Sequence, residues 1–472
     1  MKNILIAIRS IFKKGRHNVM KIVSLGIGLA VGLVLIAKVY FEQSYDDFYP
    51  DRDRVYQVWA KYQQNGGELK DYPQTSGGIA PTMQQQIPEI ETVTRYTSFR
   101  DWTFTMTDTK MKYSGRCIIA DSCFFDILPR PMLIGNAKEV LSTPMYVLIS
   151  SRIAKNIGGD VIGKNFTVDN SPGRTMTIGG VFEEVPENSH SRYDVIVSMA
   201  SAGRFMWEGS PTNMLGNDRY ISYVKLHKGV NPLALEEQVR TFVNSYFPPE
   251  EQQKVGLSID FSFHKLDNLH KELPQVKRMT WILSLLAFAL IFTAVMNYIL
   301  IVISSIVNRS KEVAVHKCYG ASENNIHGMM FGEALVHIVL SLILALLLIL
   351  AFRGTVEELL ATSLDSLLLS NGSLVLLGIC ILVFFVSGFM PGSLYARIPV
   401  ASAFRNYREN KRIWKKALLL VQFVATGFLV TMLVFVARQY TFMVNDRPGY
   451  AYENLAYCGL ACLLYTSDAA DD

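Results

Sequence analysis

Five long hydrophobic runs constrain this chain more than any other feature of its sequence. A bilayer core of about 30 Å is crossed by roughly 20 apolar residues in a helix. The runs that reach or approach this length are 22–41, 281–303, 329–352, 374–390 and 418–437. A hydrophobic fraction of 50% and a charged fraction of 18% agree with a membrane protein that has a sizeable soluble part. The sequence therefore predicts a multi-span α-helical membrane protein.

The first run has the position of a secretory signal peptide, but its apolar stretch is too long and no small-residue cleavage site follows it. It is predicted to remain as a membrane anchor. Ahead of it, residues 1–21 place apolar side chains at helical spacing, with Lys2, Arg9 and Lys13 mostly on other faces. This pattern predicts a cytoplasmic amphipathic helix that lies in the membrane interface.

Basic residues are concentrated beside the apolar runs, which assigns sides to the membrane segments. The net charge is +5, and its position indicates membrane flanks rather than a nucleic-acid partner. Segments rich in Lys and Arg stay in the cytoplasm, which places the N-terminus, 304–328 and 391–417 inside. Alternation places 42–277, 353–373 and 438–461 outside. We expect a multi-pass membrane protein with a cytoplasmic N-terminus, in contact with membrane lipid.

Residues 42–277 are predicted to form a large α+β extracytoplasmic domain in two lobes. Strand-like alternation recurs in VYQVWAKY, KYSGRCIIA, RTMTIGGVF, RYISYVKLH and LSIDFSFHKL. Helical patterns such as APTMQQQI and NPLALEEQVRTFVNSYF lie between these runs. Such a mixture is typical of an α+β domain.

The stretch GGDVIGKN, residues 158–165, satisfies the spacing of a phosphate-binding loop. However, Asn165 stands where the Ser or Thr that holds magnesium is needed. The preceding SRIAKNI reads as a helix, whereas the motif follows a strand. The loop would also lie on the side of the membrane that lacks ATP. We interpret it as a turn that leads into the strand FTVD.

Other constellations give little support to catalysis. There is no nucleophile elbow, no HExxH and no paired-His metal spacing, so we expect neither an enzyme nor a metal site in this chain. The carboxylates of Asp46, Asp47, Asp51 and Asp53 have the chemistry of cation ligands, or they are ordinary acidic residues near a membrane face. The pair Cys117 and Cys123 is compatible with a disulfide in an oxidising compartment or with two free thiols.

Polar residues within or near the apolar runs are candidates for functional positions. These intramembrane residues are Asn297, Glu333, His337 and Gln422. Polar groups in spans usually face the interior of the bundle. Glu333 and His337 are spaced for one helix face, which fits a pair, hydrogen bonds to other helices, or a proton relay. Two small-residue pairs, Gly28 with Gly32 and Gly388 with Gly392, allow helices to approach closely.

A short charged stretch, RSKEVAVHKCYGAS, separates the second and third runs. On its own it fits a solvated turn with positive membrane anchors. It also fits a short ordered element in which Val313, Ala314 and Val315 are followed by a terminating Gly320.

Taken together, these segments resemble the permease subunits of the macrolide-exporter type of ABC transporter, the MacB/FtsX-like superfamily. Outside the membrane the resemblance is carried by SYDDFYPDRDRVYQV, ADSCFFDILPRPMLIG and GGVFEEVPENSHSRYDVIVSM. In the membrane part it is carried by NRSKEVAVHKCYGAS, FGEAL and PGSLYARIPVASAFR. The resemblance covers nearly the whole chain, and its specificity lies in the combination and order of these pieces.

The resemblance implies one helix, a large periplasmic domain and then three helices. It also implies that the loop 304–328 docks on a separate cytoplasmic ABC ATPase dimer, which would bind ATP and magnesium. The coupling residues that it implies are Arg309, Lys311, Glu312, Lys317, Gly320, Pro399 and Arg405. The expected function is permease activity that couples ATP hydrolysis to movement of the periplasmic domain, either for efflux or as mechanotransmission.

The fifth run, 418–437, repeats the plan of the N-terminus, with a basic flank, one span and an outside segment 438–461. It resembles the start of a second repeat in the long, fused permeases of this superfamily. The ending CLLYTSDAADD, residues 462–472, resembles a translated sequencing adapter, so we expect the natural chain to differ there and to continue. Other expected partners are a second permease copy and a periplasmic adaptor.

A membrane receptor or sensor with a ligand-binding outside domain and no ATPase is the alternative function. A neighbouring gene for an ABC ATPase would favour the permease, and a kinase or regulator neighbour would favour the sensor. An extracytoplasmic enzyme is a third class, for which no group of residues argues.

Overall fold

The computed structural model describes residues 17–168, 173–368, 372–396, 400 and 413–445. The chain divides into a membrane unit, formed by residues up to Gln43 and from Pro274 onward, and an α+β domain, Ser44–Leu273. The amphipathic helix expected within 1–21 lies almost entirely outside the described residues, as do the segment 438–461 beyond Asn445 and the tail 462–472.

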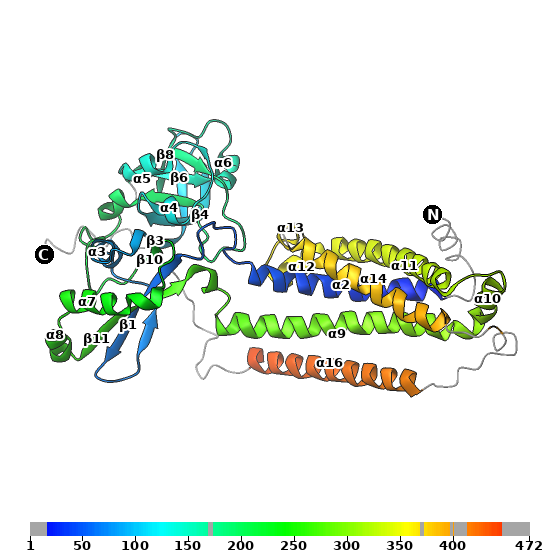
Figure 1. Ribbon diagram of the computed structural model, residues 1–472. Helices are drawn as coiled ribbons and strands as arrows, with labels where there is room; N and C mark the ends of the chain where they lie inside the picture. Colours follow the sequence, from blue (N-terminus) through cyan, green and yellow to red (C-terminus); the bar gives the residue numbers. More distant parts are fainter. Residues whose placement is uncertain (1–16, 169–172, 369–371, 397–399, 401–412, 446–472) are drawn as a thin grey trace. The chain divides into compact units, whose positions relative to one another are not determined.

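Among the described residues, five helices are long and apolar enough to cross a membrane. They are α2 (Asn18–Gln43), α9 (Pro274–Ser304), α11 (Glu323–Ala351), α14 (Ser373–Ala396) and α16 (Ile413–Asn445). Together with the α+β domain, they confirm the predicted fold class. Figure 1 shows α2, α9, α11 and α14 side by side as a bundle. By contrast, α16 contacts α9 but buries none of its apolar core.

Several helices extend beyond the apolar runs, and the extensions of the first and the fourth carry buried side chains. The first helix begins at Asn18, ahead of the run 22–41, and includes Lys21, which is buried inside the bundle with 1% of its surface exposed. The fourth continues past Pro391 to Ala396, although a proline inside a helix removes one backbone hydrogen bond. Tyr395 lies in that extension and is completely buried, and its hydroxyl donates to the carbonyl of Val302 at 3.1 Å.

Glycines set the closest approaches between the spans, as the small-residue pairs predict. A Cβ atom built on Gly28 would lie 2.2 Å from the Cβ of Ala294, and one on Gly32 would lie 2.4 Å from a side-chain carbon of Ile291. Both contacts join α2 to α9. At the other pair, Gly388 faces the ring of Phe331 on α11 and Gly392 faces His327. The absence of a side chain on these glycines therefore allows the helices to pack this closely.

The α+β domain contains one hydrogen-bonded sheet with short helices on it. Its strands are β1 (Val55–Gln64), β2 (Lys70–Tyr72), β3 (Ile90–Met106), β4 (Lys112–Ala120), β5 (Met132–Ile134), β6 (Tyr146–Ser150), β7 (Asn165–Val168), β8 (Thr175–Phe182), β9 (Val195–Ser198), β10 (Ile221–Leu226) and β11 (Leu257–Lys265). Its α-helices are α3 (Ile79–Gln86), α4 (Phe124–Ile127), α5 (Ala137–Ser142), α6 (Ser151–Ile157), α7 (Glu236–Tyr246) and α8 (Pro249–Val255). The sheet order β11-β1-β10-β3-β4-β9-β6-β8-β5 is mostly antiparallel, with parallel pairs β4–β9 and β6–β8.

The long strand β3 joins two lobes. Its first half pairs with β10, next to β1 and β11, and α3 and α7 pack on these strands around Phe242 and Phe261. Its second half belongs to a closed ring, because β7 pairs with both β3 and β8 and so completes β3-β4-β9-β6-β8-β7. Along β4, Cys117 and Ile119 belong to the apolar cluster of the ring, and the alternating Ile118 and Ala120 pack into a second cluster.

Candidate functional site

The charged stretch between the second and third spans forms a separate helix, α10 (Ile306–Cys318), after a break at Ser305. One face of α10 is anchored, because Ser310, Val313 and Ala314 are almost completely buried and the two apolar residues belong to the bundle core with Tyr395. The ordered-element interpretation of this stretch is therefore correct, and the solvated turn is wrong.

The C-terminus of α10 is closed by glycine. Gly320 has φ +85°, and its N–H donates to the carbonyl of Lys317 at 3.0 Å. The N–H of Ala321 donates to the carbonyl of His316 at 3.0 Å, and the two bonds together form a Schellman motif. His316 and Lys317 lie in the last turn, where a positive charge interacts favourably with the helix dipole. The presence of glycine at position 320 is thus explained by the helix cap, independently of any coupling role.

The other face of α10 carries an exposed stripe. Lys311, Val315 and Tyr319 follow one another at helical spacing, and 44% of Val315 and 87% of Tyr319 are exposed. We call these three residues the α10 stripe. Aromatic side chains are enriched at protein contact surfaces, so the exposed Tyr319 is the residue of this stripe that most favours such a surface. The sequence singled out Lys311 but missed Val315 and Tyr319, although their spacing with Lys311 was readable.

The remaining coupling candidates are placed less fully. Glu312 and Lys317 are half-buried, and each has an interaction partner in the structure. The backbone of Arg309 lies in α10, but its side chain is outside the described residues, as are Pro399 and Arg405. A coupling role for these residues stays a prediction.

A cluster of hydrogen bonds fixes the junction between α9 and α10. The hydroxyl of Ser305 donates to the carbonyl of Val302 at 2.6 Å and lies 3.2 Å from the hydroxyl of Tyr395. Since Tyr395 also bonds the Val302 carbonyl, α14 holds the point at which α9 ends and α10 begins. Through these bonds and its own buried face, α10 is connected to both α9 and α14.

Three of the intramembrane polar residues have partners on other helices. The Nδ2 of Asn297 donates to Ser24 Oγ at 2.6 Å, and the hydroxyl of Tyr298 lies 3.2 Å from Nδ1 of His337. Glu333 Oε1 lies 4.0 Å from the ammonium of Lys21. Because Lys21 precedes the apolar run, its entry into the bundle was not predictable from hydropathy. On α16, the Gln422 amide nitrogen has no hydrogen-bond partner among the described residues.

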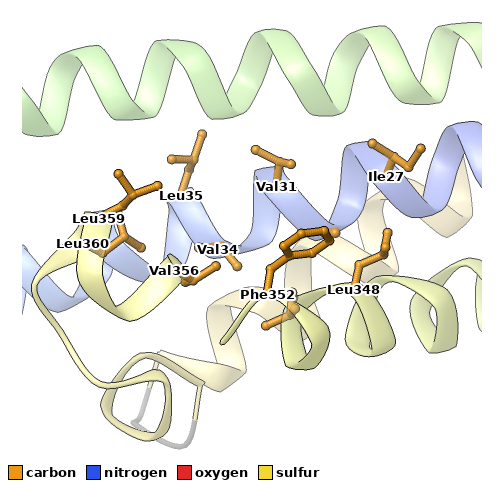
Figure 2. A pocket seen from close by; sticks show the side chains of 11 residues that line it. Ile27, Val31, Val34, Leu35, Leu348, Phe352, Val356, Leu359 and Leu360 are labelled. Carbon is orange, nitrogen blue, oxygen red and sulfur yellow. The ribbon is translucent and has the colours of Figure 1, made fainter. Parts of the chain in front are cut away.

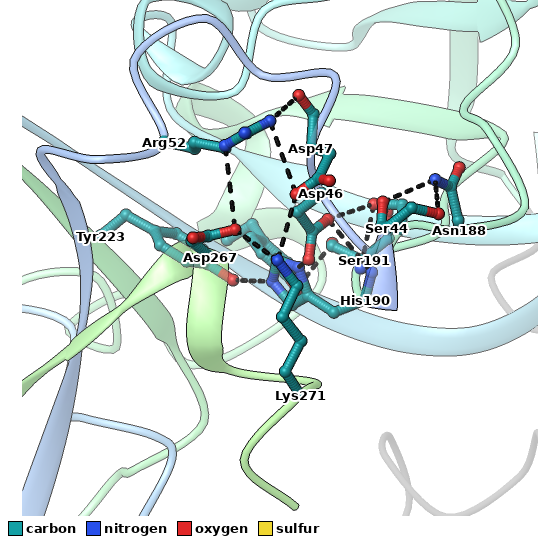
Figure 3. A network of polar contacts seen from close by, with 12 residues as sticks. Ser44, Asp46, Asp47, Arg52, Asn188, His190, Ser191, Tyr223, Asp267 and Lys271 are labelled. Atoms are coloured by element: carbon teal, nitrogen blue, oxygen red, sulfur yellow. Dashed lines mark hydrogen bonds and ion pairs between the residues drawn. The ribbon is translucent and has the colours of Figure 1, made fainter. Parts of the chain in front are cut away.

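A second polar assembly lies in the α+β domain, between the two points where the chain enters and leaves it (Figure 3). Asp46 is completely buried, with φ +61°. Its carboxylate lies 2.7 Å from His190 Nδ1 and accepts from the hydroxyl of Ser189 at 3.1 Å. The other ring nitrogen of His190 lies 2.5 Å from the hydroxyl of Tyr223. We call Asp46, Ser189, His190 and Tyr223 the Asp46 network.

Buried phenols surround this network. Burial raises the pKa of Tyr96 to about 12, and it also raises the pKa values of Tyr49, Tyr193 and Tyr223. The phenols are therefore neutral, and they stack around a buried carboxylate that depends on hydrogen bonds for its solvation. The Asp46 network fastens together segments that are far apart in the chain.

Beside it, a charge ring of Asp47, Arg52, Asp267 and Lys271 joins the same two connections. Lys271 Nζ lies 3.1 Å from Asp47 and 2.7 Å from Asp267, and Arg52 lies 3.5 Å and 3.8 Å from the same two carboxylates. Tyr45 stacks on His270 with ring centroids 3.4 Å apart. Residues that follow α2 in the chain are thus tied to residues that precede α9.

The acidic cluster after the first span is therefore occupied by ion pairs and hydrogen bonds. Asp46 and Asp47 belong to the assemblies above, and Asp51 lies 2.9 Å from Arg54 and 2.6 Å from Lys225. Within the described part of the chain, no group of His, Cys, Asp and Glu side chains is arranged to hold a metal ion. The contacts of Asp46, Asp47 and Asp51 favour the interpretation of this cluster as ordinary acidic residues rather than cation ligands.

Asp51 gives a testable pH dependence. Hydrogen bonds from Arg54 and then Lys225 lower the pKa of this carboxyl from 3.8 to about 2. A lowered folded-state pKa contributes stability that is present above pH 4 and is lost as the pH falls toward 2. We expect Asp51→Asn to lower the urea midpoint of the domain at pH 6 and to flatten its decline between pH 4 and pH 2.5, as measured by tryptophan fluorescence. Exposed Asp53→Asn is the control, and an equal decline in both variants contradicts the assignment.

Two other sequence hypotheses are settled by geometry. The GGDVIGKN loop follows helix α6 and leads into β7, so it is a turn and not a phosphate-binding loop. Cys117 and Cys123 are both free, so the disulfide alternative is wrong. Burial raises the pKa of the Cys117 thiol, and the Cys123 sulfur lies 3.0 Å from the carbonyl of Val93.

Comparison with known families and structures places the chain. Residues 20–242 match the model of the MacB-like periplasmic core domain, and residues 284–400 match that of the FtsX-like permease C-terminal region. A search of curated proteins finds no significant match.

Three similar solved structures are single domains. A domain of a permease protein from Porphyromonas gingivalis has 32% identity and a TM-score of 0.43, and the match covers 46% of this chain and 91% of that chain. The periplasmic region of MacB from Actinobacillus actinomycetemcomitans has 14% identity and a TM-score of 0.32, with the same coverages. The extracellular domain of the noncanonic ABC-type transporter YknZ from Gram-positive bacteria has 11% identity and a TM-score of 0.31, covering 43% of this chain and 98% of that chain.

The two family models match one after the other along the chain. The first covers α2 from residue 20 and most of the core domain, and the second runs across α9, α10, α11 and α14. The chain is therefore a multi-pass membrane permease subunit that belongs to the MacB/FtsX-like family of ABC transporters.

Proposed function

We propose that this permease couples ATP hydrolysis by a separate cytoplasmic ABC ATPase to movement of its core domain. The observation that carries this proposal is α10, a short helix with one face packed into the bundle core and the α10 stripe exposed on the other. A partner that pushes on the α10 stripe would move α10. Because the buried face of α10 packs into the bundle core, the spans would move with it. The partner would be an ATPase dimer that binds ATP and magnesium.

The path of this movement runs through α9. This helix is continuous from Pro274 to Ser304, which corresponds to about 46 Å at 1.5 Å per residue. Its C-terminal end is held to α10 and α14 by Ser305 and Tyr395. Its N-terminal end follows directly on the chain segment that carries Lys271 and Asp267. The charge ring then links that segment to Asp47 and Arg52 after α2, so a displacement of α9 acts on both connections of the core domain.

The same proposal places the N-terminus, α10 and the segment 391–417 in the cytoplasm of a bacterium, with the core domain outside the inner membrane. The output of the movement is efflux of a cargo or purely mechanical transmission to a periplasmic partner such as an adaptor. In this proposal α16 opens a second repeat, and a complete assembly contains two docking helices, from that repeat or from a second permease copy, because the ATPase is a dimer.

Charge reversal on the α10 stripe tests the proposal. We expect Lys311→Glu to weaken docking of the cognate ATPase roughly tenfold or more, because like charges at an interface are strongly unfavourable. Tyr319→Ala removes an exposed aromatic anchor and should lower the stimulated ATPase rate similarly. The measurement is ATPase activity against permease concentration in nanodiscs.

The matched control is Lys277→Glu, which reverses an exposed lysine near the opposite end of α9. It should leave the ATPase stimulation unchanged. Undiminished stimulation in both Lys311→Glu and Tyr319→Ala, in protein that elutes as the native species does, contradicts docking through α10 and favours the sensor alternative.

A further inference from the structure

An apolar groove opens between α2, the end of α11 and the short helix α12 (Arg353–Leu360). One wall is formed by Ile27, Val31 and Leu35, which follow one another at helical spacing along α2. The facing wall contains Phe352, Val356 and Leu359 (Figure 2). The groove has a volume of about 480 Å³, and every residue that lines it is apolar. We call it the α2–α12 groove.

The chain turns where the groove forms, which explains why this space is open. The third span ends at Ala351, and Phe352 is both its C-cap and the N-cap of α12. At its other end α12 stops at Ala361, which has φ +48°. Between these turns α12 presents Val356 and Leu359 to the groove, while Arg353 and Glu357 form an ion pair at 2.9 Å. The floor on α2 includes Ala30, whose small side chain leaves room.

Several apolar side chains in this groove are largely exposed. Leu359 is 78% exposed, Phe352 60% and Val31 46%. The groove is bounded by α2 and α11, which have the length and hydropathy of membrane spans, so we expect hydrocarbon around it. A volume of 480 Å³ is in the range of small-ligand sites, about 300–1,000 Å³.

The lining of the groove favours hydrocarbon as its occupant, because every lining side chain is apolar and the groove opens beside membrane-spanning helices. A flexible hydrocarbon chain fits such a space and requires no polar partner inside it.

Charged residues lie at the end of the groove from which the chain leads toward the core domain. Lys38, one turn beyond Leu35, donates to Thr362 Oγ1 at 2.7 Å and pairs with Glu42 at 2.7 Å. Arg353 pairs with Glu357 and with Asp365, the latter at 3.2 Å. Because carboxylates already neutralise both cations, this rim does not select an anionic headgroup. It suits the boundary between headgroups and hydrocarbon.

We propose that the α2–α12 groove binds one acyl chain of a bilayer phospholipid and that α12 covers the chain as a lid. The consequence is structural coupling to lipid. Glu357 also accepts from the N–H of Leu364 at 2.9 Å, and Thr362 bonds Lys38, so the position of α12 is connected to the end of α2. An acyl chain in the groove would pack against α12 and thereby stabilise the connection between α12 and the end of α2.

Photo-crosslinking of the full-length chain in nanodiscs tests the proposal. The probe is a phosphatidylethanolamine with a diazirine at mid-chain, and the readout is the crosslinked peptide identified by mass spectrometry. In the unmodified protein we expect adducts enriched on α2 residues 27–35 and on α12, relative to the exposed Leu382 and Phe385 of α14.

The variant that closes the groove is Val31→Trp with Leu359→Trp, which fills it from both walls at exposed positions. Losing contact with as few as two methylene groups lowers occupancy roughly tenfold, so the enrichment should fall by about that factor. The matched control is Val23→Trp with Leu346→Trp, which alters exposed positions on α2 and α11 outside the groove and should preserve the enrichment.

Two results would overturn the proposal. One is uniform labelling of α2, α12 and α14 that the groove-closing variant leaves unchanged. The other is crosslinking of the groove residues to a second copy of the chain instead of lipid. Both double variants must elute as the native species does, and a single Leu359→Gln variant, which makes the lid polar without bulk, should lower the enrichment independently. None of these readouts depends on the ATPase.

Discussion

Asp46→Ala is expected to destabilise the core domain by about 3–5 kcal/mol, because the buried donors of Ser189 and His190 lose their acceptor at about 1–3 kcal/mol each. Asp46 is completely buried and solvates its charge through His190 and Ser189, with a further contact from the His190 backbone N–H at 3.3 Å. Alanine leaves these donors unsatisfied and also replaces a residue type that tolerates φ +61°. The measurement is hydrogen exchange of peptides that cover β9 and β10, followed through a urea series.

Two comparisons separate the charge from other effects of this substitution. Asp46→Asn keeps the shape and the tolerance for a left-handed backbone but removes the charge, so we expect a smaller loss of about 1–3 kcal/mol. Asp53→Ala alters an exposed aspartate in the same segment and should change stability by less than about 0.5 kcal/mol. If Asp46→Ala and Asp53→Ala behave alike, the Asp46 network does not hold the domain together.

The same substitution also bears on transmission between the spans and the domain. The Asp46 network and the charge ring lie side by side at the two chain connections (Figure 3). The ion pairs of the ring are half-buried, so solvent screens them more strongly than it screens the completely buried Asp46. The buried network is therefore the stronger fastening of the segment that follows α2. We expect Asp46→Asn to reduce movement of the domain in response to ATP more than it reduces docking at α10.

The sequence was sufficient for features that depend on local periodicity. The hydrophobic runs identify all five span-length helices, and alternation in VYQVWAKY and LSIDFSFHKL locates β1 and β11. The end of α10 was readable from Gly320, because only a residue that adopts a positive φ easily suits that position. These features are decided by residues that are near one another in the chain.

Contacts between segments that are distant in the chain could not be predicted from the sequence. Asp46 and His190 are 144 residues apart, and nothing in SYDDFY or PENSHSRYD indicates that they meet. Lys21 looked like an ordinary membrane flank, yet it lies buried beside Glu333 of α11. Such pairs follow from the way the lobes and the bundle close. That closure is set by the sum of many weak contacts rather than by one motif.

Gly28→Leu is expected to have the largest effect in the membrane unit. Even a methyl group at this position would lie 2.2 Å from the Cβ of Ala294, which is fixed to the backbone of α9 and cannot turn aside. The two helices must therefore separate, and overpacking of this kind costs about 1–3 kcal/mol, with leucine at the upper end or beyond. Loss of thermal stability in detergent micelles and loss of ATPase stimulation should appear together, because α9 carries the proposed movement.

A reciprocal exchange distinguishes steric contact from a general intolerance of larger residues in spans. Gly28→Ala combined with Ala294→Gly moves the methyl group from α9 to α2 and should restore most of the stability that Gly28→Ala alone removes. Gly378→Leu is the matched control, because a Cβ at Gly378 on α14 meets nothing within 4 Å. If Gly378→Leu is as damaging as Gly28→Leu, or if the exchange gives no rescue, the close contact of α2 with α9 is not what fixes the bundle. Rescue by the exchange would instead show that this contact sets the spacing at which α9 works.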